Sequence, residues 1–217
     1  MKLRESVANQ RVSREHQEQG YTLVALLALM TVLALFAMAA APSIRQQAQR
    51  ERENEAIYRG EQVADAIRVY YSSQVGQRRL SGEQGLPTSI EQLLEGVPRG
   101  TKKVQVLRAS AARDPLSESG EWNLVKPRSS QLSDFQQSLM LFTENVLPTT
   151  KDQQLQQFMA PPTVPVLGIA SSGLSSGSDD SSSGPFIGVV SSSKNNSVIN
   201  YYGIDHHNGW VFTPLFR

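Results

Sequence analysis

An uncharged and mostly apolar run extends from Tyr21 to Ile44. At a rise of about 1.5 Å per residue the run would form a helix of roughly 36 Å, which is long enough to cross a hydrocarbon layer of about 30 Å. The first charged residue after it is Arg45, and helix-forming polar residues continue to position 56. We therefore expect one transmembrane helix segment over 21–44, and a continuation of the same helix into water over 45–74.

By itself, this run is compatible with a cleaved secretory signal peptide or with an uncleaved membrane anchor. A secretory signal peptide would be cut at the small residues Ala39–Ala41, directly before Pro42, but such signals have shorter apolar cores and a basic rather than mixed polar leader. An uncleaved single-pass anchor is the other alternative. Loop charge does not decide the orientation, because basic residues flank both ends. They are Lys2, Arg4, Arg11 and Arg14 before the run and Arg45, Arg50, Arg52 and Arg59 after it.

The junction before the run carries a processing motif. Gly20 follows a polar leader and precedes Tyr21-Thr22-Leu23. This pattern resembles the signature of type IV prepilins and type II secretion pseudopilins, in which a prepilin peptidase cuts after the glycine and methylates the new amino terminus. The resemblance implies a leader over 1–20 and an N-methylated Tyr21. Pro42 stands where family members carry a helix-kinking proline, and a proline inside a helix removes one hydrogen bond.

Further motifs follow in the order seen in proteins related to the major type II pseudopilin. The resemblance covers about residues 20–126, and the last thirty or so more loosely. It implies an α+β fold in which a long N-terminal helix packs on a small antiparallel β-sheet. The motifs are Tyr58-Arg59-Gly60-Glu61-Gln62, residues 66–71, Leu86-Pro87-Thr88 with residues 89–94, Asp114-Pro115 and Gly120-Glu121-Trp122.

The chain departs from the family at one position. Ala25 is the fifth residue counted from Tyr21, where most pilins and major pseudopilins have a glutamate that meets the methylated amine of a neighbouring subunit. A charge pair in apolar surroundings is favourable only when both partners are present. In lacking this acid the chain resembles the minor pseudopilin at a fibre tip, and we expect a tip, minor or non-filament role.

Composition limits the possible partners and cofactors. Cysteine is absent, so disulfides and thiolate zinc sites are excluded. Beyond position 20 the chain has 17 basic and 17 acidic side chains, which gives no bulk electrostatic reason to bind nucleic acid. A local basic patch is conceivable, but a solvated face is the better interpretation. Its members would be Arg99, Lys102, Lys103 and Arg108.

The helix beyond Pro42 has two halves. Residues 45–56 are almost wholly polar, which is typical of a helix that bridges solvent or meets partners. From Ile57 an apolar stripe recurs with a period near 3.6 and should carry the folded domain. Its members are Ile57, Gly60, Val63, Ala64, Ile67, Tyr70 and Tyr71, and we expect Tyr58, Tyr70 and Tyr71 to pack in the core or at its rim.

Residues 75–127 are expected to form a small α+β domain. Leu86 to Gly96 predicts a short helix, with a capping pair of Thr88 and Glu91 or of Ser89 and Gln92 and with Gly96 as its stop. Residues 104–107 and 122–125 predict strands of one small antiparallel sheet, separated by turn signals at positions 114–115 and 118–120.

The rest of the chain divides into three parts. Residues 128–170 are interpreted as an insertion with a helix over 132–146, and residues 171–184, rich in serine and glycine, as a flexible segment. Residues 185–217 predict C-terminal β-strands at 186–191, 197–202 and 210–213, with turns at 194–196 and 205–209. This meander should return to the helix or extend the first sheet.

No motif indicates an enzyme, and no cofactor is expected. His206 and His207 are interpreted as part of a polar turn, because adjacent residues on an extended segment face opposite ways. Asp179, Asp180 and Asp205 are candidate calcium ligands, since major pseudopilins bind calcium in a C-terminal loop, but their spacing matches no calcium loop. We therefore assign no metal ligand.

The sequence thus predicts a structural subunit of a type II secretion or type IV pilus-like assembly. The resemblance implies a single pass through a bacterial inner membrane and a C-terminal domain in the periplasm. Its partners would be other pilin-like subunits, a prepilin peptidase and an assembly platform with a cytosolic ATPase. The alternative is a monomeric, membrane-anchored periplasmic binding or adhesion domain. Expected packing residues in a fibre are Leu23, Ala25, Leu26, Leu27, Met30 and Leu33.

Overall fold

The computed structural model describes residues 3–144, 146–148, 150, 152–159 and 184–216, with side chains described except at 3–20 and 39–43. The chain divides into two compact units, Met1–Ala48 and Gln49–Arg217. Helix α1 (Leu3–Arg78) contributes to both. The described residues combine this long N-terminal helix with small antiparallel sheets, which is the mixed α+β class that the sequence predicts.

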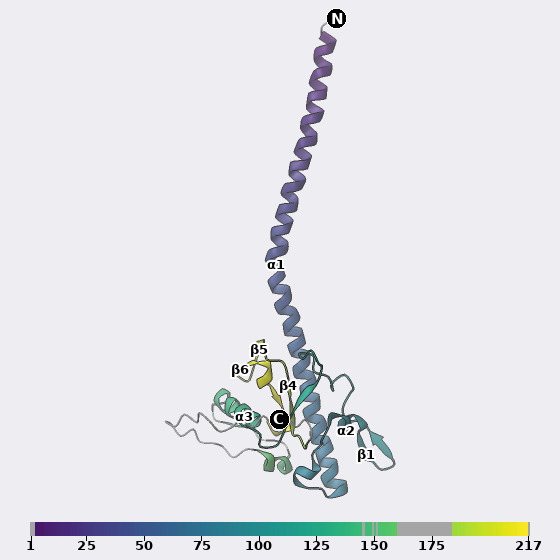
Figure 1. Cartoon of the computed structure of the whole chain (residues 1–217), viewed down its shortest axis with the longest axis vertical. Helices are drawn as coiled ribbons and strands as arrows, with labels where there is room; N and C mark the ends of the chain where they lie inside the picture. The colour runs from purple at the N-terminus through teal and green to yellow at the C-terminus, as the bar shows by residue number, and fades with distance from the viewer. Residues whose placement is uncertain (1–2, 145, 149, 151, 160–183, 217) are drawn as a thin grey trace. The chain divides into compact units, whose positions relative to one another are not determined.

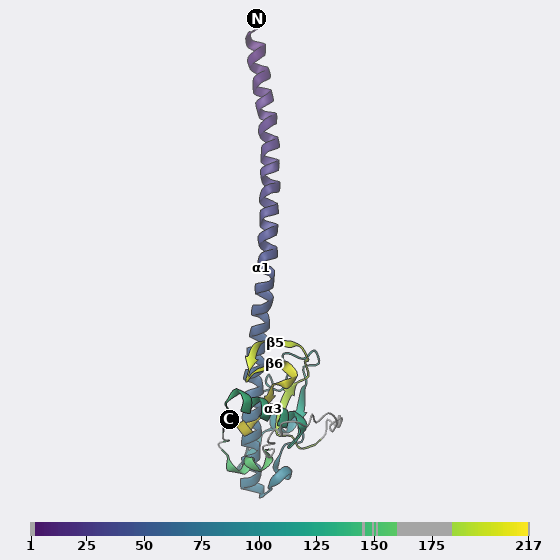
Figure 2. The ribbon, with the colours of Figure 1, turned by 90° about the vertical axis from the view of Figure 1, so that its left-hand side faces the viewer.

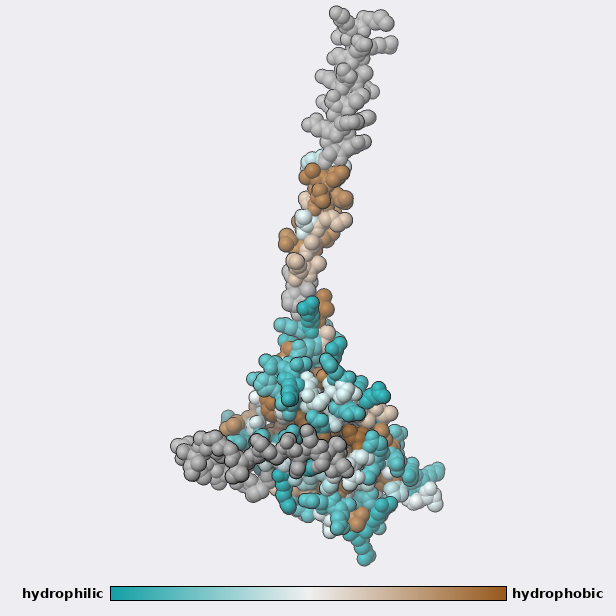
Figure 3. Space-filling view, in the orientation of Figure 1, coloured by the Kyte–Doolittle hydropathy of each residue, from teal (hydrophilic) through white to brown (hydrophobic). Residues whose placement is uncertain are grey.

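In the first unit, α1 contains a segment that is long and apolar enough to cross a membrane. The segment Tyr21–Met38 has a mean hydropathy of 2.3, and none of it is buried within the chain. Figure 3 shows it as a brown band on the helix. A helix suits such a segment because it satisfies every backbone polar group internally. The helix continues through position 42, and the kink at Pro42 stays a prediction.

In the second unit, the apolar stripe of α1 faces the core as predicted. Val63 and Ile67 are fully buried, and Tyr71 is almost so. Tyr58 is 56% exposed, so the expectation that it packs in the core or at its rim is wrong. The helix ends at Arg78, four residues beyond the predicted end, where Arg79 takes a left-handed conformation with φ 54°.

A three-stranded antiparallel sheet packs with this helix. Its strands are β3 (Trp122–Val125), β4 (Gly188–Ser191) and β7 (Val211–Phe212), in the order β3-β4-β7. Every residue of β4 is buried, as expected for a central strand. The predicted strand 122–125 is confirmed at the same bounds, and the C-terminal part extends the first sheet, one of the two predicted outcomes.

Two separate hairpins complete the strands. The first joins β1 (Val97–Arg99) to β2 (Lys102–Val104), and the second joins β5 (Asn196–Tyr201) to β6 (Ile204–His206). The expectation that residues 104–107 share a sheet with 122–125 is wrong, because β2 pairs with β1 alone. The predicted C-terminal meander is also wrong in its pairing, since β4 and β5 lie in different sheets. Figure 1 and Figure 2 show β5 and β6 beside α1.

Short helices fill the connections. Helix α2 (Ile90–Glu95) stops at Gly96 as predicted, but its capping pair is Thr88 with Gln92, whose side chain both accepts from the Thr88 N–H and donates to the Thr88 hydroxyl. Helix α3 (Ser130–Phe142) is capped by Ser129 and confirms a helix near the predicted 132–146. The 3-10 turns are η1 (Gly82–Gly85), η2 (Gln153–Phe158), η3 (His207–Gly209) and η4 (Pro214–Phe216). The predicted flexible segment 171–184 lies outside the described residues except for Gly184.

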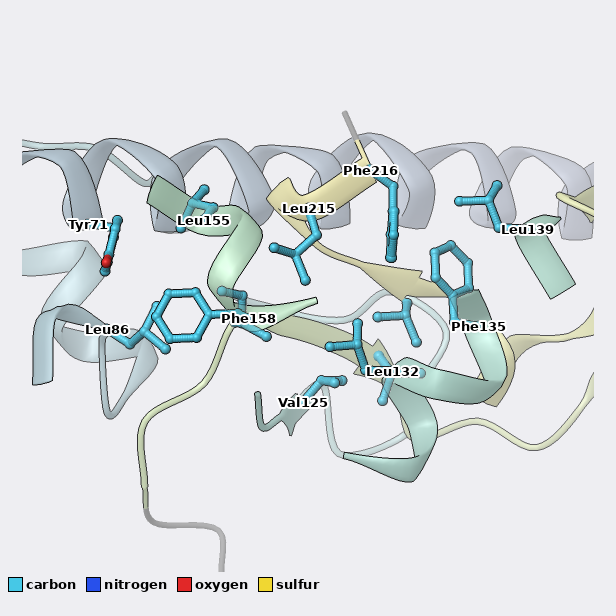
Figure 4. Close-up of a cluster of buried hydrophobic side chains, with 13 residues drawn as sticks. Tyr71, Leu86, Val125, Leu132, Phe135, Leu139, Leu155, Phe158, Leu215 and Phe216 are labelled. Atoms are coloured by element: carbon cyan, nitrogen blue, oxygen red, sulfur yellow. The ribbon is translucent and has the colours of Figure 1, made fainter. Parts of the chain in front are cut away.

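Two apolar clusters hold the second unit together. One gathers α3, η2 and η4 with Tyr71 of α1, and Figure 4 shows Phe135 and Phe216 facing each other within it. The other lies around Val63, Ile67 and Trp210. In this second cluster the Phe212 ring lies directly against the backbone of Gly60, where a Cβ would overlap the ring.

Candidate functional site: the apolar helix and the Glu53 cluster

The predicted packing residues of the apolar segment are all exposed within the chain. Their exposed fractions lie between 55% and 62% for Leu23, Leu26, Leu27, Met30 and Leu33. The Thr31 hydroxyl is satisfied within the helix, since Thr31 Oγ1 donates to the Ala28 carbonyl over 2.8 Å. Such a surface is stable in lipid or against other apolar helices, and not in water.

The processing residues lie at the start of this segment. Tyr21 is 78% exposed, and Ala25 is exposed as well. The helix runs through Gly20 without a break. Cleavage after Gly20 and methylation of Tyr21 therefore stay predictions.

In the second unit, a buried carboxylate lies in the polar half of α1. Glu53 has no exposed surface, and its oxygens accept hydrogen bonds from the C-terminal hairpin. The Val198 N–H lies 2.9 Å from Oε1 and 3.0 Å from Oε2, and the Ile199 N–H lies 2.8 Å from Oε2. The Gln49 amide donates to Glu53 Oε1 and to the Asn196 carbonyl. The carboxylate thus fastens β5 to α1.

The strand is irregular where it meets this carboxylate. Consecutive N–H groups of a regular strand point to opposite edges, yet those of Val198 and Ile199 reach one side chain. The register of β5 on β6 shifts by three residues between Asn196 and Tyr201, so the regular pairing is interrupted there. This irregular stretch supplies two neighbouring donors, and Glu53 supplies the anion that accepts from both.

His207 completes the cluster from η3. Its Nε2 lies 3.0 Å from Glu53 Oε1, its Nδ1 lies 3.2 Å from Ser193 Oγ, and the ring contacts Trp210 edge-on. An ionised carboxylate only accepts hydrogen bonds, so Nε2 carries the hydrogen, and in the neutral ring Nδ1 accepts from the Ser193 hydroxyl. His207 lies in a turn, as predicted, but the residue is only 3% exposed and is bonded to a buried carboxylate rather than to solvent.

The surroundings of Glu53 set its charge state. Burial by itself raises the pKa of Glu53, but the hydrogen bonds from Val198, His207, Ile199 and Gln49 outweigh burial and hold the pKa below its ordinary value. The side chain is therefore an anion at neutral pH. A serine, an imidazole and a carboxylate in this order also form the catalytic triad of hydrolases. Here the imidazole ring is buried, and Ser193 Oγ accepts a hydrogen bond from the Asn195 N–H within a turn. We interpret the cluster as structural.

A second buried carboxylate, that of Asp114, connects to the first through Ser191, Ser193 and His207. Asp114 Oδ2 accepts from the Ser191 hydroxyl over 2.6 Å, and Asp114 Oδ1 accepts from the Leu116 N–H. The Ser193 N–H in turn donates to Ser191 Oγ. A chain of hydrogen bonds therefore runs from Glu53 on α1 through the end of β4 to the loop that holds Asp114.

The remaining candidates of the sequence stay apart from this cluster. Asp205 and His206 are exposed, and Asp179 and Asp180 lie outside the described residues. Among the residues that the structure describes, no group of three histidine or acidic side chains could hold a metal ion. Sequence reasoning missed Glu53, whose partners are about 150 residues away.

Comparisons with protein-family models, with curated proteins and with solved structures found no match to this chain. Its functional interpretation therefore depends on its own residues.

Proposed function

We propose that this chain is a pilin-like structural subunit, processed after Gly20 and assembled into a short periplasmic fibre of a type II secretion or type IV pilus-like machine. The observation that carries the proposal is the Gly20-Tyr21-Thr22-Leu23 junction at the head of an apolar helical segment whose side chains are exposed. A prepilin peptidase would remove residues 1–20. The mature chain would then wait in the bacterial inner membrane with residues 45–217 in the periplasm.

The proposed mechanism is mechanical. An assembly platform driven by a cytosolic ATPase would lift the helix out of the lipid and place it against the helices of other subunits. The exposed side chains of Leu23, Leu27 and Met30 would then exchange lipid contact for protein contact. Because lipid tails are as apolar as leucine, the gain comes from close packing rather than from leaving water. The proposal assigns no catalytic step to the chain.

Extraction by force also requires that the periplasmic unit stay on its helix. The cluster around Glu53 meets that requirement, because one side chain of α1 holds the N–H groups of Val198 and Ile199 and the ring of His207. Breaking these bonds would leave the buried His207 ring and two partly buried N–H groups without partners, which is unfavourable. The buried stripe of Val63 and Ile67 supplies the apolar part of the same attachment.

Crosslinking between anchors tests the proposal. The chain has no cysteine, so Leu27→Cys introduces a single thiol on the face that also contains Leu23 and Met30. Val32→Cys is the matched control, because it is also exposed and lies about 180° away from Leu23 on a helical wheel. In native membranes, crosslinks to other pilin-like anchors should form at Leu27→Cys, exceed those at Val32→Cys, and disappear without the assembly ATPase.

A second candidate function is a monomeric, membrane-anchored binding or adhesion domain. It is favoured by apolar side chains at the end of α3 and just beyond it, where Leu141 is 77%, Phe142 58% and Val146 71% exposed. Such side chains in a folded unit are typical of a binding surface. In this case neither cysteine variant would form crosslinks between anchors, and the chain would keep residues 1–20.

A further inference from the structure

A groove lies between the last turns of α1 and the β1–β2 hairpin, and no role has been given to it above. Its volume is about 440 Å³. Val69 and Gly76 line it from the helix, and Val97, Pro98 and Val104 line it from the hairpin. The Gln77 amide donates to the Pro98 carbonyl over 2.8 Å and fixes the hairpin to the helix beside the groove. This hydrogen bond therefore fixes the position of the hairpin relative to the helix at the edge of the groove.

The groove is apolar and open to solvent. Val69 is 44% and Val104 45% exposed, although both are valines. On the helix side, Ser72, Ser73 and Gly76 are small, and a Cβ at Gly76 would meet no atom within 4 Å. A bare helix surface of this kind lets another chain approach closely.

The face of the β1–β2 hairpin that carries Val97 and Val104 changes from apolar at its base to cationic at its tip. Val97 pairs with Val104, and Arg99 pairs with Lys102. Because side chains two residues apart share a face, these four side chains form one surface, with the valines near the base and the cations at the tip. The two ends lie about 6.6 Å apart along the strand. Among the described residues, neither Arg99 nor Lys102 has an acidic side chain within 4.0 Å.

We infer that this groove binds an extended segment of a partner protein in which an apolar side chain is followed two residues later by a carboxylate. The apolar side chain would cover Val69, Val97 and Val104, and the carboxylate would meet Arg99 and Lys102. The match in spacing and charge distinguishes this occupant from a wholly apolar one. The inference is independent of fibre assembly, because it uses only residues 69–106.

The hairpin lysines have another use, which does not account for the whole face. Lysines on an edge strand prevent edge-to-edge aggregation, and Lys103 serves that purpose on the opposite face, where it lies 3.7 Å from Glu95 Oε2. Edge protection does not require Arg99 and Lys102 to share a face with two valines, one of which is largely exposed.

Peptide binding to the full chain in detergent micelles tests the inference. The probe is the acetylated, fluorescein-labelled peptide Ser-Val-Ser-Asp-Ser-Ser, which in extended form places the valine and the aspartate on one face, two residues apart. The matched peptide has asparagine in place of the aspartate. Two exposed ion pairs of about 0.2–1 kcal/mol each predict a preference of roughly two- to thirtyfold for the acidic peptide, measured by fluorescence polarisation.

Charge reversal locates the site. Arg99→Glu and Lys102→Glu should each abolish that preference, while Lys194→Glu, an exposed cation in the turn before β5, should leave it unchanged. Equal binding of the two peptides, or a preference that survives both reversals, would overturn the inference. Crosslinking of two chains through Val104→Cys, blocked by neither peptide, would also overturn it and identify a second copy as the occupant.

Discussion

His207 Nε2 donates a hydrogen bond to Glu53 Oε1 over 3.0 Å and so joins two buried residues that stand 154 positions apart. The contact explains how the C-terminal hairpin is attached to α1, although β5 and β6 share no hydrogen-bonded sheet with β4. It also explains part of the polarity of residues 45–56 of α1, because the Glu53 side chain in this stretch is buried and does not contact solvent.

Removing the carboxylate should strongly destabilise the periplasmic unit. Glu53→Ala leaves the partly buried N–H groups of Val198 and Ile199 and the buried ring of His207 without an acceptor, so we expect a loss of about 3–5 kcal/mol in the free energy of unfolding. Denaturant unfolding followed by tryptophan fluorescence measures this loss, because Trp210 contacts His207.

The matched control is Glu55→Ala on the same helix. Glu55 is exposed and pairs with Arg59, and such pairs contribute less than about 1 kcal/mol. Equal effects of the two substitutions would mean that the buried cluster does not hold the hairpin.

The same group predicts a dependence of stability on pH. The folded pKa of Glu53 lies below its unfolded value, so its contribution is complete above the unfolded pKa of about 4.3 and is lost as the pH falls through the folded pKa. Stability should therefore decrease in acid. In Glu53→Gln the decrease should be shallower below pH of about 4.3, because one titrating group is gone. Parallel stability curves for the two proteins over this range would contradict the assignment.

Two glycines of α1 should respond to alanine with opposite signs. Gly60→Ala places a methyl group against the Phe212 ring and should cost about 1–3 kcal/mol through overpacking. Gly76→Ala meets no atom and should stabilise by up to about 1 kcal/mol, because alanine favours the last turn of α1 more than glycine does. Thermal unfolding of both variants checks the pair. A stabilising Gly60→Ala would show that α1 and β7 are not packed this closely.

A carboxylate at position 25 should change assembly. Ala25→Glu supplies the acid that could meet the methylated amine of a neighbouring subunit, so we expect increased incorporation into fibres, measured by fractionation of native membranes. Ala34→Glu, with the same charge at an exposed position about 180° away on a helical wheel, should not reproduce it. With Ala25 unchanged, a glutamate-bearing pilin-like partner should copurify with the chain. Long fibres of the unaltered chain alone would refute the role given to Ala25.

Part of this fold could be predicted from local pattern. The 3.6-residue recurrence of Val63 and Ile67 indicated the buried face of α1, and the run Trp122–Val125 indicated a strand. The position of β4 between β3 and β7 could not be predicted, since strand neighbours far apart in sequence leave no local signal. Glu53 was missed for the same reason, because in sequence it stands among charged residues and only the fold brings the N–H groups of an irregular strand and an imidazole to it. The histidine pair His206-His207 in an otherwise turn-like segment was the one available hint.

The central claim is that the chain is processed as a prepilin, and the amino terminus of the mature protein tests it most directly. Mass spectrometry of the protein from its native host should show a chain that begins at N-methylated Tyr21, and replacing Gly20 by a bulkier residue should leave the precursor uncut. A terminus at Pro42, or an intact Met1 in most molecules, would contradict the account.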